Sequence, residues 1–172
     1  MRSAVLLAAD GTAASLERTL EAVAPAVDEV VVSCRDDQRD AVASALSGVD
    51  YRLAIDPVPG GGPVADIRSG CRVARGRRTF VTTTGTAAVE PPFVTRLFEA
   101  ADGDGAVAWR TSSRRPLAAV YDTDAVIDAA ETTLGMGSTS MVDMLDRLTV
   151  STVSSRTRAN AEADHSTESR ST

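Results

Sequence analysis

A glycine-rich segment, DPVPGGGP at residues 56–63, is the strongest candidate for binding chemistry in this sequence. It follows an apolar stretch of strand length and leads into an amphipathic stretch that begins near Pro63. Glycine amides let a ligand approach closely, and the free amides at a helix N-terminus attract anions. Asp56 ends the preceding strand, where its carboxylate could accept hydrogen bonds from a base or a ribose. An equally weighted interpretation is a connector whose glycines serve only the turn.

Two other segments follow apolar runs. ADGT at residues 9–12 lies where nucleotide-binding folds carry a phosphate loop, but it has neither a GxxxxGK[ST] nor a GxGxxG pattern. The carboxylate of Asp10 would repel a phosphate unless a metal ion lay between them, and capping preferences favour a simple turn in which Thr12 caps the next helix. TTTGT at residues 82–86 offers hydroxyls but no carboxylate, so on its own it is a poor magnesium site.

The other reactive side chains predict no chemistry. Cys34 and Cys71 cannot form a CxxC pair or a four-ligand zinc site, so we expect reduced thiols that fill small apolar gaps. The single histidine, His165, lies in a polar tail and is predicted to be inert.

Apolar runs of strand length alternate with amphipathic stretches over most of the chain. Strands are expected at residues 3–8, 29–34, 51–55 and 79–84. Helices are expected from Thr12 through Val27, over 36–46, over 64–74, and from Pro91 to about Ala100. Apolar strands separated by helices predict an α/β fold with a mostly parallel sheet and helices on both faces. The carboxyl ends of such strands meet at one edge, which brings together four segments, at residues 9–12, 33–35, 56–63 and 84–88.

The pattern loosens after residue 104. Strands at 106–110 and 117–121 are expected to form a hairpin, followed by helices from Thr123 and over 138–148 and by a short strand at 149–153. Beyond residue 153 the chain is dominated by Ser, Thr, Arg and Glu. We therefore expect one domain over residues 1–153 and a disordered polar tail over 154–172.

The charge balance limits the partners. The 172 residues include 24 acidic and 18 basic residues, for a net charge of −6, and every basic residue is Arg. Because phosphate contacts dominate nucleic-acid affinity, this balance argues against a nucleic-acid partner. No apolar run approaches the ~20 residues that span a bilayer, and no signal peptide is evident, so we expect a cytoplasmic protein without a membrane partner.

Several motifs resemble those of one enzyme family. VDEVVVSCRDDQR at 27–39, the Asp-Pro pair at 56–57 and GGPVADIRSGCRVA at 61–74 are similar to segments of the molybdenum cofactor guanylyltransferases. These enzymes belong to the MobA-like nucleotidyltransferases, which share a Rossmann-like α/β fold. The family's N-terminal loop has its counterpart in LAAD at 7–10, its GPLAGI segment in GPVADI at 62–67, its strand-four acidic motif in TGTA at 84–87, and its late PL-A-Y element in PLAAVY at 116–121. The resemblance covers residues 2 to 153 in order.

The resemblance implies a reaction and a set of contacts. Members transfer GMP from Mg²⁺-bound GTP to the terminal phosphate of molybdopterin and release pyrophosphate. By this resemblance, the backbone of Leu7, Ala8 and Ala9 would contact the guanine nucleotide, and Ser33 stands where the family has an asparagine that contacts it. Asp56 matches the family's nucleotide-binding acid. Further binding positions are Gly62 and Pro63, and the candidate metal ligands are Asp10 and Asp56.

The departures from the family pattern fall on the catalytic positions. Asp10 replaces a loop glycine, the Arg- and Lys-bearing continuation of that loop is missing, Gly85 aligns with the Mg²⁺-binding aspartate, and Asp66 replaces the glycine of the GPLAGI motif. Losing a metal carboxylate and a phosphate-binding lysine would remove several kcal/mol of transition-state stabilisation.

Two hypotheses follow from these departures. One is a working guanylyltransferase in which Asp10 or Asp56 holds the metal and an arginine such as Arg35 or Arg68 replaces the lysine. The other, which the substitutions favour, is a degenerate paralogue that binds a nucleotide, a pterin cofactor or a partner protein without turnover. A homo-oligomer, or a hetero-oligomer with an active relative, is also compatible with the sequence.

Overall fold

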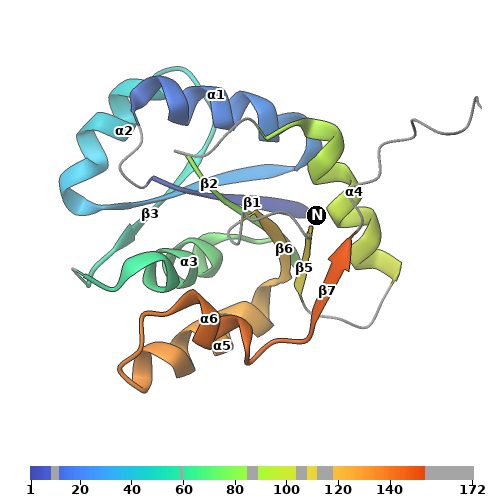
Figure 1. The fold of residues 1–172 in the computed structure, drawn as a ribbon. Coiled ribbons are helices and arrows are strands. Elements are labelled where there is room, and N and C mark those ends of the chain that lie inside the picture. The colour runs from blue at the N-terminus through green and yellow to red at the C-terminus, as the bar shows by residue number, and fades with distance from the viewer. Residues whose placement is uncertain (9–11, 59, 85–88, 104–107, 112–117, 154–172) are drawn as a thin grey trace, which may run out of the picture.

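A computed structural model describes residues 1–8, 12–58, 60–84, 89–103, 108–111 and 118–153 (Figure 1). Within these residues, seven strands form one sheet in the order β3-β2-β1-β4-β6-β5-β7. Strand β6 is antiparallel to both of its neighbours, and the other strand pairs are parallel. The prediction of a mostly parallel α/β sheet is therefore confirmed. The strands are β1 (Arg2–Leu7), β2 (Glu29–Arg35), β3 (Arg52–Asp56), β4 (Arg78–Thr83), β5 (Ala108–Thr111), β6 (Ala119–Asp122) and β7 (Val150–Val153).

Helices cover both faces of the sheet, as predicted. On one face lie α1 (Ala13–Val23), α2 (Arg39–Ala45) and α4 (Pro91–Gly103). On the other lie α3 (Gly62–Val73), α5 (Thr123–Gly135) and α6 (Met141–Leu145), as Figure 1 shows. Each face has its own core of buried apolar side chains, because successive residues of a strand point to opposite faces. Leu6 and Phe80 belong to the first core, and Val5 and Val81 belong to the second.

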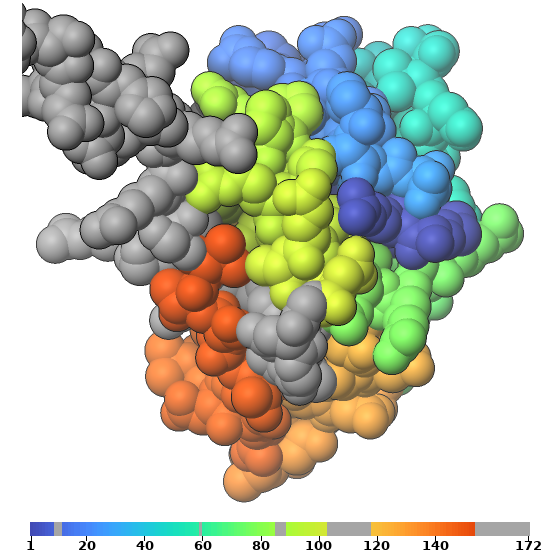
Figure 2. Space-filling model, turned by 90° about the vertical axis from the view of Figure 1, so that its right-hand side faces the viewer, coloured from blue at the N-terminus to red at the C-terminus, as the bar shows by residue number. Residues whose placement is uncertain are grey.

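The amino-terminal end of β1 is fixed to α4. The guanidinium of Arg2 lies 5.0 Å from the centroid of the Phe98 ring and forms an ion pair of 3.6 Å with Asp102. Figure 2 shows the first residues of the chain beside α4 on this face of the molecule. These contacts lie at the sheet edge opposite the carboxyl ends of β1, β2, β3 and β4.

Two of the predicted helices begin or end as a 3-10 turn in the structure. The helix after Thr12 was expected to reach Val27, but α1 ends at Val23 and a 3-10 turn, η1 (Ala24–Ala26), follows. Pro25 lies in that turn, and because proline has no N–H it cannot continue an α-helix. The helix expected over 36–46 starts as another 3-10 turn, η2 (Asp36–Gln38), before α2 begins.

The carboxyl-terminal half agrees with the expected order of elements. The predicted hairpin is confirmed, since β5 and β6 are antiparallel with Ala108 opposite Tyr121. The helix expected over 138–148 is shorter, because α6 spans Met141–Leu145 after Ser140 caps it. The tail predicted to be disordered, residues 154–172, lies outside the described residues. No helix in the described part of the chain is long and apolar enough to cross a membrane.

Candidate functional site

The carboxyl ends of β1, β2, β3 and β4 form one edge of the sheet, called here the carboxyl rim. Register pairs Leu7 with both Ser33 and Thr83, and Arg35 with Asp56. The strand ends that lead into the candidate segments therefore meet at this rim, as predicted for parallel strands, while residues 9–11 and 85–88 lie outside the described residues.

Hydrogen bonding between the strands continues to the last residues of β1. The Ala8 N–H donates to the Ser33 carbonyl at 2.9 Å, and the Thr84 N–H donates to the Leu7 carbonyl at 3.2 Å. These two backbone groups of Leu7 and Ala8 are thus occupied by the sheet. A nucleotide contact through the other backbone groups of this loop stays a prediction, and the predicted contacts of Ala9 and Asp10 lie outside the described residues.

Ser33 connects the end of β2 to α3. Its hydroxyl donates to the Asp66 carbonyl at 2.8 Å, and its side chain is buried. The helix can approach this closely because residue 70 is glycine: a Cβ atom there would lie 2.3 Å from Cγ1 of Val5 and 3.3 Å from Cβ of Ser33. In this structure Ser33 positions α3 against the sheet, and its predicted contact with a nucleotide remains to be tested.

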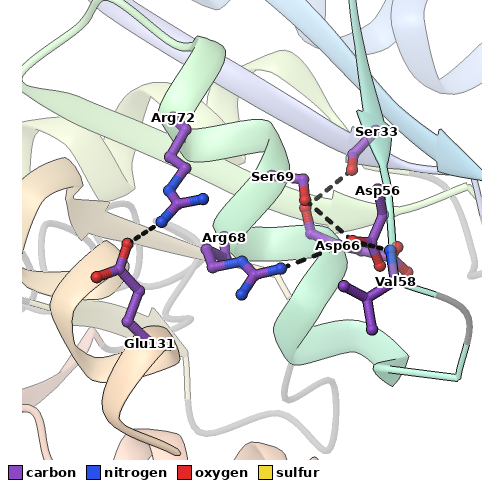
Figure 3. Close-up of polar contacts among 8 residues, drawn as sticks. All are labelled: Ser33, Asp56, Val58, Asp66, Arg68, Ser69, Arg72 and Glu131. Atoms are coloured by element: carbon purple, nitrogen blue, oxygen red, sulfur yellow. Dashed lines mark hydrogen bonds and ion pairs between the residues drawn. The ribbon is translucent and has the colours of Figure 1, made fainter. Parts of the chain in front are cut away.

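Asp56 is turned toward the loop and helix that follow it (Figure 3). Its side chain is only 4% exposed. Its Oδ1 atom accepts hydrogen bonds from the Val58 N–H at 3.2 Å and from the Ser69 hydroxyl at 3.4 Å, and lies 3.8 Å from the Arg68 guanidinium. The carboxylate therefore closes the turn between β3 and α3 and ties that turn to the helix.

The glycine-rich segment leads into α3, as the sequence predicts. Gly60 and Gly62 have φ values of +80° and +63°, in the left-handed region that favours glycine. Gly62 is the first residue of α3, Pro63 occupies the first turn, and no side chain caps the N-terminal amides. The predicted positions Gly62 and Pro63 thus lie at a helix terminus whose polarity favours an anion.

Asp66 stands where the family's GPLAGI motif has glycine, and the sequence alone assigned no role to its carboxyl group. It lies in α3 and is part-buried. Burial, followed by the like charge of Asp56, raises the pKa of its carboxyl to about 6, while Arg35 acts in the opposite direction. A titratable carboxyl near neutral pH at a sheet edge is a candidate functional group. The sequence feature that could have pointed to this carboxyl group is the replacement of a motif glycine by a charged residue.

Of the two candidate metal ligands, Asp10 and Asp56, only Asp56 lies among the described residues. The described residues contain no cluster of three or more His, Cys, Asp or Glu side chains that could hold a metal ion. The Oδ1 atom of Asp56 is already shared by two donors and a guanidinium, so a metal ion at Asp56 would have to bind its Oδ2 atom. Asp10 and Gly85, the other two positions that the metal hypotheses involve, lie outside the described residues.

The two arginines suggested as substitutes for the family lysine both have acidic neighbours. Arg35 binds Asp37 through its Nε at 3.0 Å, and Arg68 pairs with Asp56. A phosphate at either guanidinium would therefore compete with a carboxylate already in place.

Comparison with known proteins identifies the family. Residues 5–151 match the family model described as the MobA-like NTP transferase domain. The chain belongs to this family. Two archaeal relatives, each named probable molybdenum cofactor guanylyltransferase, are 32% identical to it. The Haloferax mediterranei protein aligns over 82% of this chain and 68% of its own length, and the Natronomonas pharaonis protein over 71% and 61%.

A solved structure shares the fold. Molybdopterin-guanine dinucleotide biosynthesis protein A from Archaeoglobus fulgidus superimposes with a TM-score of 0.70 at 23% identity, over 90% of this chain and 83% of that protein. The MobA-like resemblance and the Rossmann-like nucleotidyltransferase fold predicted from the motifs are thereby confirmed.

Proposed function

We propose that this chain is a molybdenum cofactor guanylyltransferase-type protein that binds GTP at the carboxyl rim and transfers GMP to molybdopterin. The observation that carries the proposal is the arrangement of the rim. The ends of four parallel strands meet there beside the uncapped N-terminus of α3, on a chain whose residues 5–151 match the MobA-like domain. An open α/β sheet binds its ligands at this edge.

The chain's own groups supply positioning and electrostatics. The N-terminal amides of α3 would attract the phosphates of the nucleotide, and Asp56 holds the preceding turn in the shape that exposes them. Ser33 fixes α3 against β2 through the Asp66 carbonyl. Group transfer to a phosphate depends mostly on such positioning and on charge stabilisation. In this family Mg²⁺ offsets charge at the reacting phosphate, and Asp10 and Asp56 are the candidate ligands for it in this chain.

A second candidate function is binding of the nucleotide without turnover. It is favoured by the contacts of Asp56, whose Oδ1 atom is committed to Val58, Ser69 and Arg68 and is therefore not free to take part in the transfer. A chain of this kind could hold a nucleotide for a partner or pair with an active relative.

Two measurements on the full chain separate these functions. Calorimetry with GTP, with and without Mg²⁺, measures binding, and pyrophosphate release in the presence of molybdopterin measures turnover. Binding together with pyrophosphate release supports the guanylyltransferase, whereas binding without release supports the second candidate. Absence of GTP binding under both conditions would exclude both functions at the carboxyl rim.

A further inference from the structure

A cavity lies at the amino-terminal edge of the sheet, where β2 and β3 begin. It has a volume of about 370 Å³, and its walls come from η1 and the residues after it, from the residues around the start of β3, and from the connection between α3 and β4. Pockets of this size hold small organic molecules. Because β2 has seven residues and a strand advances about 3.3 Å per residue, the cavity lies roughly 20 Å from the carboxyl rim.

One ion pair in the lining belongs to the fold. Glu29 accepts hydrogen bonds from the Ser3 hydroxyl and the Arg75 N–H, and its carboxylate pairs with the guanidinium of Arg52. Arg52 also donates a hydrogen bond to the Val73 carbonyl. The charges of Glu29 and Arg52 therefore offset each other, and both side chains are held in place by the protein itself.

The other charged side chains of the lining carry both signs. Asp50 and Arg75 are exposed, and neither side chain forms a hydrogen bond or an ion pair with the part of the chain that the structure describes. Asp28 accepts a hydrogen bond from the Arg2 N–H at 2.6 Å through its Oδ2 atom, which fixes its carboxylate beside the cavity. Carboxylates and a guanidinium that border one small space favour a ligand with both a cationic and an anionic group.

Apolar side chains line the same cavity. Ala24, Val27 and the ring of Tyr51 are half-buried, since they pack against the core beneath α1, α2 and α4 and still reach the cavity. A ligand that covers them removes further apolar surface from water, which is favourable. The ligand is therefore expected to combine its two charges with an apolar group.

We propose that this cavity binds a zwitterionic α-amino acid with an apolar side chain. Its carboxylate pairs with Arg75, its ammonium group pairs with Asp50 and Asp28, and its side chain lies against Val27 and Tyr51. The site does not depend on the proposed function, because its lining includes none of the residues that form the carboxyl rim.

NMR of the ¹⁵N-labelled full chain at constant ionic strength and pH 7 tests the chemistry of the ligand. The probes are leucine, 3-methylbutylamine, which lacks the carboxylate, and 4-methylpentanoate, which lacks the ammonium group. We expect leucine to shift the amides of Glu29, Tyr51 and Arg75 in a saturable way in the millimolar range. The two singly charged compounds should bind about tenfold more weakly or less, because each loses one charged contact. A leucine response without saturation, or equal affinity for all three probes, would overturn the proposal.

Variants of the two unpaired side chains test the assignment without disturbing the fold. Arg75→Gln retains the backbone N–H that binds Glu29, and Asp50→Asn removes a charge that makes no contact within the described residues. We expect each variant to weaken leucine binding about tenfold. Arg77→Gln and Asp40→Asn make the same changes at exposed residues outside the lining and should leave binding unchanged. Equal weakening by lining and control variants would contradict the proposal.

The same spectra distinguish this site from the proposed nucleotide site. Amides of Ser33 and Thr84 report on the carboxyl rim, whereas those of Tyr51 and Arg75 report on the cavity. Leucine shifts confined to the amino-terminal edge would support the proposal whether or not GTP binds at the rim. Leucine shifts confined to the rim would overturn it and leave the proposed function untouched.

Discussion

A carboxylate with several partners lies near each end of α3, and the two surroundings differ in charge. At the amino-terminal edge of the sheet, Glu29 accepts hydrogen bonds from the Ser3 hydroxyl at 2.5 Å and from the Arg75 N–H, and pairs with Arg52 at 3.5 Å. At the carboxyl rim, Asp56 has Arg68 as its cation, but the carboxyl of Asp66 lies close enough to interact with it as a like charge.

The pKa directions express the same difference. Burial raises the pKa of Glu29, but the hydrogen bonds from Ser3 and Arg75 and the charge of Arg52 outweigh burial, so the net pKa is lowered. The pKa of Asp66 is raised to about 6. The contacts at the amino-terminal edge therefore stabilise the ionised form of Glu29. At the carboxyl rim, burial and the charge of Asp56 destabilise the ionised form of Asp66. Unfavourable local arrangements of this kind concentrate at functional sites.

The largest expected effect is the loss of the Glu29 anchor. Glu29→Ala leaves the Ser3 hydroxyl, the Arg75 N–H and Arg52 without their acceptor, and we expect the free energy of unfolding to fall by about 3 kcal/mol. Urea denaturation at pH 7 measures this change. Glu131→Ala, which removes the exposed partner of Arg72, is the control and should change stability by no more than about 0.5 kcal/mol. Similar losses of stability in the two variants would contradict the distinction between a carboxylate with three partners and a single surface ion pair.

Removing only the charge of Asp56 should have a smaller effect. Asp56→Asn retains an oxygen that can accept from Val58 and Ser69 but loses the attraction to Arg68, so we expect a loss of about 1.5 kcal/mol. The same urea denaturation applies. A neutral result would mean that the hydrogen bonds alone hold the turn.

The smallest expected effect has the opposite sign. Because the folded-state pKa of Asp66 is raised above its ordinary value of 3.8 to about 6, the native state binds more protons in that interval, and stability falls as pH rises from about 4 to 6. Asp66→Asn should remove this decline and stabilise the protein at pH 7 by about 1 kcal/mol, after allowance for solvent screening. Thermal unfolding between pH 4 and pH 8 measures it.

The matched control for this prediction is Asp128→Asn, which changes an exposed aspartate in α5. It should leave the decline between pH 4 and pH 6 in place. If Asp66→Asn destabilises the chain at pH 7, the like-charge description of the rim is wrong.

Much of the fold follows from local sequence. The valine-rich run at 30–32 predicts β2, and Leu16, Leu20 and Val23 at helical spacing predict α1, since all are buried as expected. The spacing extended falsely to Val27, because an apolar residue beyond Pro25 still fits the period although the helix has ended. Periodicity carries no information about where a backbone donor is missing.

The candidate site is less predictable from sequence. The convergence of Ser33, Asp56 and the glycine turn at one edge follows from the parallel strands, and this was predicted. The direction of the Asp56 side chain was not, because it depends on the Val58 N–H and on Ser69 and Arg68, which come from the turn and from a helix. The significance of Asp66 likewise depends on a through-space neighbour that no spacing rule reveals.

The missing side chain at residue 70 has a mechanical consequence. With no room for even a methyl group between α3 and the Val5 side chain, the helix rests almost directly on the central strands and cannot slide inward. A ligand that engages the Gly60–Gly62 turn must then be accommodated by the turn itself, whose positive-φ glycines allow it to adjust. Conformational adjustment to a ligand is thus confined to the peptide groups of the Gly60–Gly62 turn, while α3 and the strands it packs on keep their positions.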